Sequence, residues 1–286
     1  MKSIKLEIKH QGFDFTYYPC KESNKTLILM AIKKSTGRMI ESSINFLQKR
    51  GFNVLVCITQ NVVNADIECF GDAIEYLKKN DVKNIGIIGV SFTAIYALVA
   101  SNYYQDINLT ILISPCDILH NGLLEKYTNI YDPYLRFNGN RLDYLKYDII
   151  KENLHYAKDS LESFRAVLDE IETKKFIKKS NIIGCNNMKG KLILISASDD
   201  EVWDSYKYVR RIELSKENNY NIDIEKWVYP YGTHILIPEG IIKDLIPLKT
   251  EKAIASYSKS LKFHKRECKS ARVDIEKRFN ELITNW

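Results

Sequence analysis

Residues 84–101, NIGIIGVSFTAIYALVAS, place a serine between an apolar strand pattern and a helix pattern. The first seven residues are almost all apolar, as expected of a strand buried on both faces, and the spacing that follows predicts a helix. Ser91 stands at the junction, in the pentapeptide GVSFT (89–93). A sharp strand-to-helix turn of this kind holds a serine oxygen above the sheet beside a helix N-terminus, which suits a nucleophile. A serine that only caps the helix is the alternative, because Thr93 replaces the second glycine of a G-x-S-x-G turn.

Apolar runs of the same kind recur along the chain and alternate with helix patterns. Buried strands joined by helices form parallel sheets, so the alternation predicts a doubly wound α/β fold with a mostly parallel sheet. Residues 3–18 instead alternate apolar and polar side chains, which predicts an antiparallel hairpin at the sheet edge. The predicted strands are 26–31, 52–59, 84–90, 109–115, 191–197 and 222–230, and the predicted helices between them include 39–51 and 66–80.

The segment 118–189 interrupts this alternation, because it is polar, rich in tyrosine and helical in pattern, with no convincing buried strand. We therefore expect a core made of 1–117 and 190–286, with 118–189 as a helical cap or lid over the carboxyl edge of the sheet. The basic, amphipathic pattern after residue 249 predicts a helix that packs on the core. The tyrosines expected to line a pocket under the cap are Tyr127, Tyr131, Tyr134, Tyr144, Tyr147 and Tyr156.

A candidate acid and a candidate base follow two later strands. The strand 191–197 leads into SDDEVWDS, which puts Asp199 and Asp200 at its carboxyl end. Either carboxylate could orient a histidine or cap the next helix, and Asp200 is preferred because a short Glu-Val-Trp turn follows it. His234 lies in the loop after the last strand, so the order along the chain is serine, aspartate, histidine, which is the order of one type of catalytic triad. Structural or surface roles are expected for the other histidines, namely His10, His120, His155 and His264.

The composition is that of a globular protein and favours a small-molecule partner over nucleic acid or membrane. The net charge of +6 is a small excess of 42 basic over 36 acidic residues, and no run approaches the ~18 apolar residues of a membrane span. The N-terminal residues do not form a signal-peptide core, so we expect a cytoplasmic protein. The six cysteines show no metal-ligand spacing, which predicts reduced thiols and neither metal nor cofactor. Nucleic-acid binding through the basic tail is a minor alternative, based on Lys262, Lys265, Arg266, Lys269 and Arg272.

Three stretches together resemble a known family of hydrolases. IGIIGVSFTAIYALVAS, KLILISASDDEVW and WVYPYGTHILIPEG are similar to the C-terminal catalytic domain of acyl-CoA thioester hydrolases and bile acid-CoA:amino acid N-acyltransferases. The resemblance covers roughly residues 65–240 and implies an α/β-hydrolase fold, a triad of Ser91, Asp200 and His234, and a thioester or ester substrate. A serine nucleophile in that family implies hydrolysis, whereas a cysteine implies transfer to an amine.

The expected reaction needs two backbone amides to stabilise an oxyanion. The amide of Phe92 is one candidate, and the amide of Ile32 or Lys33, in the loop after the first core strand, is the other. Lys33 and Lys34 could alternatively contact an anionic group of the substrate, such as a carboxylate or a coenzyme A phosphate. An acyltransferase or amidase on the same fold, and a non-catalytic binding protein, are the rival hypotheses. The sequence does not indicate an oligomeric state.

Overall fold

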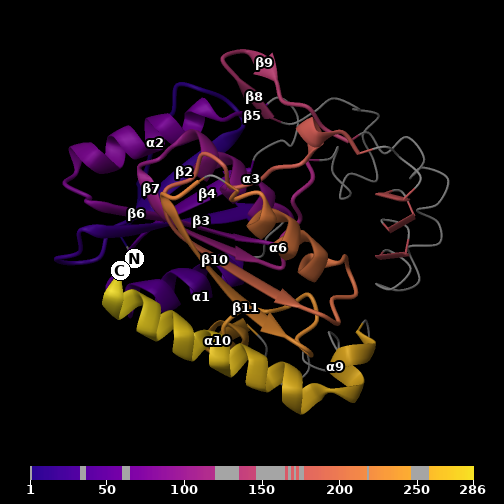
Figure 1. Cartoon of the computed structure of the whole chain (residues 1–286). Coiled ribbons are helices and arrows are strands. Elements are labelled where there is room, and N and C mark those ends of the chain that lie inside the picture. The colour runs from indigo at the N-terminus through magenta and orange to yellow at the C-terminus, as the bar shows by residue number, and fades with distance from the viewer. Residues whose placement is uncertain are drawn as a thin grey trace.

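The computed structural model contains one large sheet covered by helices (Figure 1). It describes residues 2–32, 37–59, 65–119, 135–145, 177–217, 219–245 and 258–286, together with the pairs 165–166, 169–170 and 172–173. Much of the segment 118–189 lies outside the described residues, as do all of its named tyrosines except Tyr144. The predicted cap therefore stays a prediction.

The sheet has eight strands in the order β1-β2-β4-β3-β6-β7-β10-β11. The six strands from β4 to β11 are parallel, while β2 pairs antiparallel with both β1 and β4. This confirms the predicted doubly wound α/β fold and its antiparallel edge. The strands are β1 (Ile4–Lys5), β2 (Phe13–Tyr18), β3 (Lys25–Ile32), β4 (Asn53–Thr59), β6 (Asn84–Val90), β7 (Ile107–Ile113), β10 (Gly190–Ala197) and β11 (Ile222–Tyr229).

Two apolar layers hold helices against the two faces of the sheet. Successive side chains of a strand point to opposite faces, so in β3 Ile28 packs in the layer with α2, α3 and α6, and Leu27 packs in the layer with α1 and α10. The predicted C-terminal helix packs on the core through α10, which buries Ile275 and Phe279. The helices are α1 (Gly37–Gln48), α2 (Glu68–Lys79), α3 (Phe92–Tyr103), α6 (Ser205–Leu214), α7 (Glu239–Leu245), α9 (Lys259–Phe263) and α10 (Lys265–Asn285), with a 3-10 turn at Lys179–Asn181.

The parallel arrangement brings distant parts of the chain to one edge of the sheet. Strands β3, β6, β7, β10 and β11 end at Ile32, Val90, Ile113, Ala197 and Tyr229. Because parallel strands share a direction, the segments that follow these residues meet at the carboxyl edge, where ligands of open α/β sheets bind. This edge is where Ser91, Asp200 and His234 fall.

A second, small sheet lies outside the core and was not predicted. It joins β5 (Ala65–Asp66) to β8 (Leu135–Phe137) and β9 (Asn140–Arg141). Strands β8 and β9 fall within 118–189, for which the sequence predicted helices. Strands of two or three residues are too short to show a period-2 pattern, so the sequence carried no signal for them.

Two expectations about the chain as a whole concern its cysteines and its helices. All six cysteines lie in the described ranges and are free thiols, and five of them are buried, as predicted. Within the residues that the structure describes, no helix is long and apolar enough to cross a bilayer.

Candidate active site

Ser91 occupies a strained turn between β6 and α3. Its backbone has φ +55° and ψ −127°, a combination that a non-glycine residue adopts only at an energetic cost. The turn is fixed from both sides, because the amide of Ser91 donates to the carbonyl of Ile113 (2.8 Å) and α3 passes very close to β6. A Cβ atom on Gly89 would lie 2.6 Å from the Cα of Ala94, so only glycine fits at position 89.

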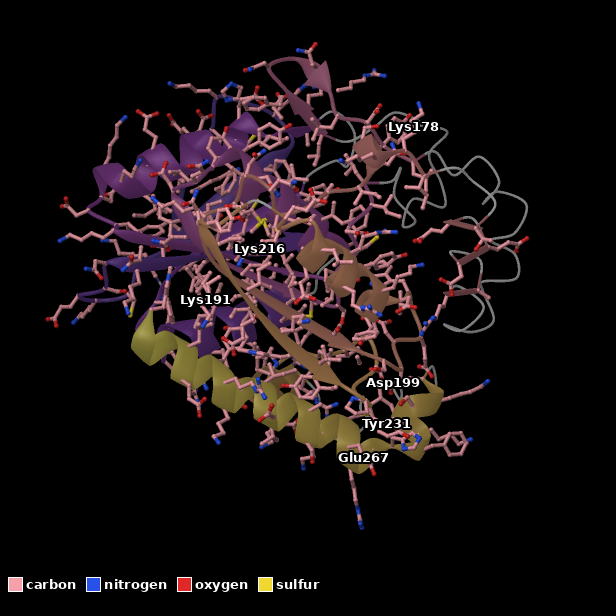
Figure 2. The ribbon with its side chains drawn as sticks, viewed as in Figure 1. Lys178, Lys191, Asp199, Lys216, Tyr231 and Glu267 are labelled. Atoms are coloured by element: carbon pink, nitrogen blue, oxygen red, sulfur yellow. The ribbon has the colours of Figure 1, made fainter. Side chains whose placement is uncertain are left out.

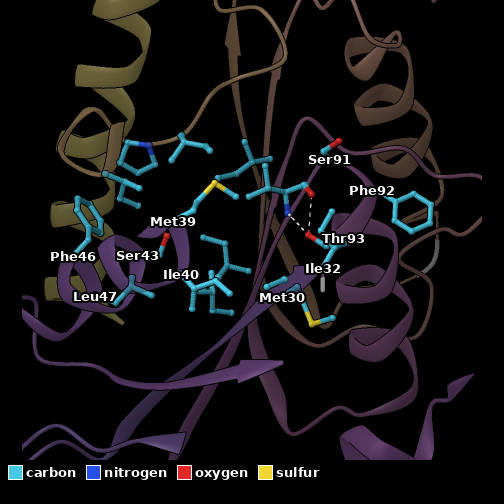
Figure 3. Close-up of a pocket in the computed structure, with 18 of the residues that line it drawn as sticks. Met30, Ile32, Met39, Ile40, Ser43, Phe46, Leu47, Ser91, Phe92 and Thr93 are labelled. Atoms are coloured by element: carbon cyan, nitrogen blue, oxygen red, sulfur yellow. Dashed lines mark hydrogen bonds between the residues drawn. The ribbon is translucent and has the colours of Figure 1, made fainter. Parts of the chain in front are cut away.

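Thr93, the departure from the G-x-S-x-G pattern, is accommodated by hydrogen bonds to the end of β6. Its hydroxyl accepts from the amide of Val90 (2.9 Å) and donates to the carbonyl of Val90 (2.8 Å), as the dashed lines in Figure 3 show. The threonine therefore satisfies backbone groups at the turn, and its buried hydroxyl costs little.

The structure brings Ser91, His234 and Asp200 together in one hydrogen-bonded line. His234 Nε2 lies 2.6 Å from Ser91 Oγ, and His234 Nδ1 lies 3.0 Å from both carboxylate oxygens of Asp200. Asp200 is fully buried and the His234 side chain is 13% exposed. The amides of Val202 and Trp203 donate to Asp200 Oδ1 (3.0 and 3.3 Å). A carboxylate that faces Nδ1 favours the tautomer with its proton on Nδ1, which leaves Nε2 to accept from the serine hydroxyl.

Unlike Asp200, the Asp199 carboxylate contacts the backbone of the loop that carries His234 and not the imidazole. Its Oδ1 accepts from the amides of Gly232 and Thr233 (both 2.9 Å), and its Oδ2 accepts from the hydroxyl of Ser260 in α9. Figure 2 places Asp199 and Tyr231 at the same end of the molecule, beside α9. The two adjacent aspartates thus separate into one that contacts the imidazole and one that anchors the loop carrying it.

Two further residues hold His234 and were not singled out from the sequence for this role. Ser114, which follows β7 with φ +46°, donates its hydroxyl to the carbonyl of His234 (2.9 Å). The indole of Trp203 donates to the carbonyl of Ser114 (3.1 Å), and its ring meets the imidazole edge-on at 4.8 Å between centroids. The only sequence signal for Ser114 is that it ends a core strand at the carboxyl edge.

The segment that continues from Ser114 is tied to α6 by a partly buried ion pair. Asp117 is fully buried and accepts two hydrogen bonds from the guanidinium of Arg211. Burial raises the pKa of Asp117 to about 6, although the Arg211 guanidinium opposes that rise. The pair fixes the chain just beyond the serine that supports His234.

Two of the candidate oxyanion donors lie among the described residues. Ile32 is the last residue of β3 and Phe92 is the first residue of α3, and both line the same pocket as Ser91. Lys33 and Lys34 lie outside the described residues, so their predicted roles stay predictions.

The other histidines that the structure describes make contacts elsewhere in the molecule. His10 pairs with Asp72 at the surface, and His264 stacks on Tyr231. His120 and His155 lie outside the described residues. In the described ranges no three His, Cys, Asp or Glu side chains converge in a way that could hold a metal ion.

A doubly wound sheet with a serine on its strand-to-helix turn, and an aspartate and a histidine after later strands, defines the class of α/β hydrolases. The family model for the BAAT / acyl-CoA thioester hydrolase C-terminal domain matches residues 65–239. The match spans more than half of the chain, which therefore belongs to this family and is a hydrolase of the esterase and thioesterase type. A comparison with curated proteins gives no significant match.

Solved structures share the fold at low sequence identity. An esterase of Pyrococcus furiosus has a TM-score of 0.51 at 19% identity, over 91% of this chain and 90% of that chain. An α/β hydrolase from a Medee basin deep-sea metagenome library has a TM-score of 0.51 at 15% identity, over 100% and 99%. An esterase of the archaeon Pyrobaculum calidifontis has a TM-score of 0.51 at 11% identity, over 98% and 86%. These likenesses confirm the α/β-hydrolase fold.

Proposed function

We propose that the protein hydrolyses a small-molecule acyl thioester or ester through a covalent intermediate on Ser91. The observation that carries this proposal is the continuous contact from Ser91 Oγ to His234 Nε2 (2.6 Å) and from His234 Nδ1 to Asp200 (3.0 Å). A serine hydroxyl is a weak nucleophile, and a hydrogen-bonded base with its own orienting carboxylate is the arrangement that activates it.

In the first half of the reaction, Ser91 Oγ attacks the acyl carbonyl carbon while His234 Nε2 takes the hydroxyl proton. The Asp200 carboxylate keeps the imidazole oriented and stabilises the imidazolium that forms. His234 then gives its proton to the leaving thiol or alcohol, the bond from the carbonyl carbon to that group breaks, and an acyl ester of Ser91 remains.

In the second half, His234 takes a proton from water as the water oxygen attacks the acyl ester. The bond between the carbonyl carbon and Ser91 Oγ breaks, the proton returns to the serine, and a carboxylic acid leaves. Both tetrahedral intermediates carry a negative oxygen, for which the backbone amides of Phe92 and of Ile32 or Lys33 are the proposed donors. One such hydrogen bond is commonly worth about 3 kcal/mol in the transition state.

Hydrolysis of p-nitrophenyl esters and acyl-CoA thioesters tests this proposal. We expect Ser91→Ala to lower kcat/KM by at least about 10⁴-fold, because the nucleophile is lost. Ser198→Ala is the matched control, since Ser198 is an exposed serine just after β10 at the same edge, and we expect it to keep the wild-type rate. Equal activity of the Ser91→Ala and wild-type proteins, or no activity of the wild type on any member of both series, would contradict the proposal.

A further inference from the structure

An apolar pocket extends from Ser91 into the layer between the sheet and α1. The described residues that line it come mainly from β3, β6, α1, α7 and α10, and among these described lining residues only Ser43, Ser91 and Thr93 have polar side chains. The hydroxyl of Thr93 is already bonded to the backbone of Val90. Because burial of a polar group without a partner is costly, a pocket of this kind selects hydrocarbon.

The position of the pocket relative to the candidate triad assigns it to the acyl side of a substrate. Ile32 and Phe92, whose amides are candidate donors to the carbonyl oxygen in the proposed reaction, line it together with Ser91. Neither His234 nor Asp200 is part of the pocket wall. The leaving group must stay within reach of His234 Nε2 to receive its proton, so the other substituent of the carbonyl, the acyl chain, is the one that enters the pocket.

The depth of the pocket follows from the elements that line it. Helix α1 contributes Met39 near its start and Phe46 further along, and these positions are about 10 Å apart at 1.5 Å per residue. Strand β3 contributes Ile32 at the sheet edge and Leu29 below it, again about 10 Å apart at 3.3 Å per residue. Met39, Ser43 and Phe46 share one face of the helix because they are spaced by four and three residues, and Figure 3 shows this row.

Two aromatic rings line the part of the pocket that lies further along α1 from Met39. Phe46 and Phe279 line it and meet edge-to-face with centroids 6.3 Å apart. Behind them, the Arg50 guanidinium lies 3.5 Å from the centroid of Phe46 and is held by Glu276 (3.1 Å). An end wall supported in this way stops an entering chain instead of yielding to it.

We propose that this pocket binds a straight acyl chain of about eight carbons, with Ser43 on its side wall and the Phe46–Phe279 pair at its end setting the length. An extended chain advances about 1.3 Å per carbon, given C–C bonds of about 1.5 Å at a tetrahedral angle, so about 10 Å holds about eight carbons. The cavity of about 220 Å³ is also smaller than the roughly 300–1,000 Å³ of sites that enclose a drug-sized ligand. This inference rests on the proposed function, and it concerns residues of α1 and α10 that lie outside the family match at 65–239.

The test is the dependence of kcat/KM on chain length, measured on p-nitrophenyl esters from acetate to palmitate. We expect kcat/KM to rise by up to about fourfold per methylene, the equivalent of about 0.8 kcal/mol, up to about eight carbons and then to level off or fall. Ser43→Leu puts a larger side chain into the pocket and should lower the octanoate-to-acetate ratio at least tenfold. Glu41→Leu, an exposed position on the same helix, is the matched control and should leave the ratio unchanged.

A variant of the end wall gives the opposite change. Phe46→Ala should move the optimum to chains longer than eight carbons, and its melting temperature shows whether it folds. If it does not fold, the ratio in Ser43→Leu decides alone. Suppose that hydrolysis depends on Ser91, but that kcat/KM does not change with chain length and Ser43→Leu leaves the octanoate-to-acetate ratio unchanged. That result would overturn this inference and leave the proposed function in place.

If the wild type hydrolyses no ester, a binding measurement distinguishes failure of the proposed function from failure of the proposed acyl pocket. Octanoate is then titrated calorimetrically into the wild type and into Ser43→Leu. Binding that weakens at least tenfold in the variant supports the acyl pocket although the proposed function has failed. Absence of binding to the wild type, or equal binding to both proteins, overturns the pocket as well.

Discussion

The part of the chain that matches the family, residues 65–239, and the segments that flank it contribute different things to the same site. The family part supplies Ser91, Asp200 and His234, together with the backbone amides and the indole that orient them. The flanking segments supply the far wall of the pocket through α1 and α10. Apart from the proposed oxyanion donor in the loop after β3, the side chains proposed for the chemistry and those proposed to select the acyl chain therefore lie in different stretches of sequence.

The two parts meet at Asp199. This aspartate belongs to the family part and holds the histidine loop, yet it also accepts a hydrogen bond from Ser260, which belongs to the C-terminal flank. A second contact between the two parts is the buried ion pair between Arg272 of α10 and Glu239 at the start of α7. The C-terminal flank therefore supports the loop that carries the candidate base.

Among the substitutions that test this difference between the two parts of the chain, Asp200→Asn is expected to lower activity most. The amide keeps the shape of the side chain but can neither hold the imidazole in the required tautomer nor stabilise the imidazolium, so kcat should fall about 10⁴-fold. Steady-state kinetics on a p-nitrophenyl ester measure it, with circular dichroism to show that the variant folds. A folded Asp200→Asn protein with a kcat within tenfold of wild type would break the assignment of this carboxylate.

A smaller effect is expected from the neighbouring residue, in Asp199→Asn, and a still smaller one from Ser260→Ala. Because Asp199 touches the loop backbone and not the imidazole, its loss should lower kcat about tenfold to a hundredfold, with KM changing less than about threefold. The loss of one hydrogen bond in Ser260→Ala corresponds to about 1 kcal/mol, or about fivefold. If Asp199→Asn were as damaging as Asp200→Asn, with the fold intact, the two aspartates would have exchanged roles and the division would be wrong.

The smallest effect is expected at Thr93. Thr93→Ala removes two hydrogen bonds to the backbone of Val90 and should lower the free energy of unfolding by about 1–2 kcal/mol, with kcat within about threefold of wild type. Urea denaturation measures the difference, and Thr93→Ser, which keeps the hydroxyl, is the control and should lose less. A Thr93→Ala protein as stable as wild type would show that the hydroxyl contributes nothing to the turn.

The framework of the fold could be predicted from the sequence because its signals are local. Buried parallel strands are short apolar runs, and each of the six predicted runs is a strand of the sheet. Ser91, Asp200 and His234 could be placed at one edge because each follows such a run, and parallel strands end together. The choice of Asp200 over Asp199 depends on one short turn, and in the structure Asp200 contacts the imidazole whereas Asp199 contacts the backbone of the loop.

The support of the site and the shape of its pocket could not be predicted, because they arise from contacts between segments far apart in the sequence. Ser260 and Asp199 are separated by 61 residues, and nothing near either residue in the sequence points to the other. The pocket likewise depends on how Phe46 of α1 and Phe279 of α10 pack together. Helical periodicity predicts that each ring lies on a buried face, but it does not predict that the two rings contact each other.

The most direct test of the central claim, that Ser91 is a nucleophile activated by His234, is labelling by a fluorophosphonate probe followed by peptide mapping with mass spectrometry. The account predicts one phosphonyl adduct on the peptide that contains Ser91, absent in Ser91→Ala and formed at least about 10³-fold more slowly in His234→Ala, whereas His10→Ala labels like the wild type. A folded wild-type protein that carries no adduct on Ser91, or that labels equally fast without His234, would contradict it.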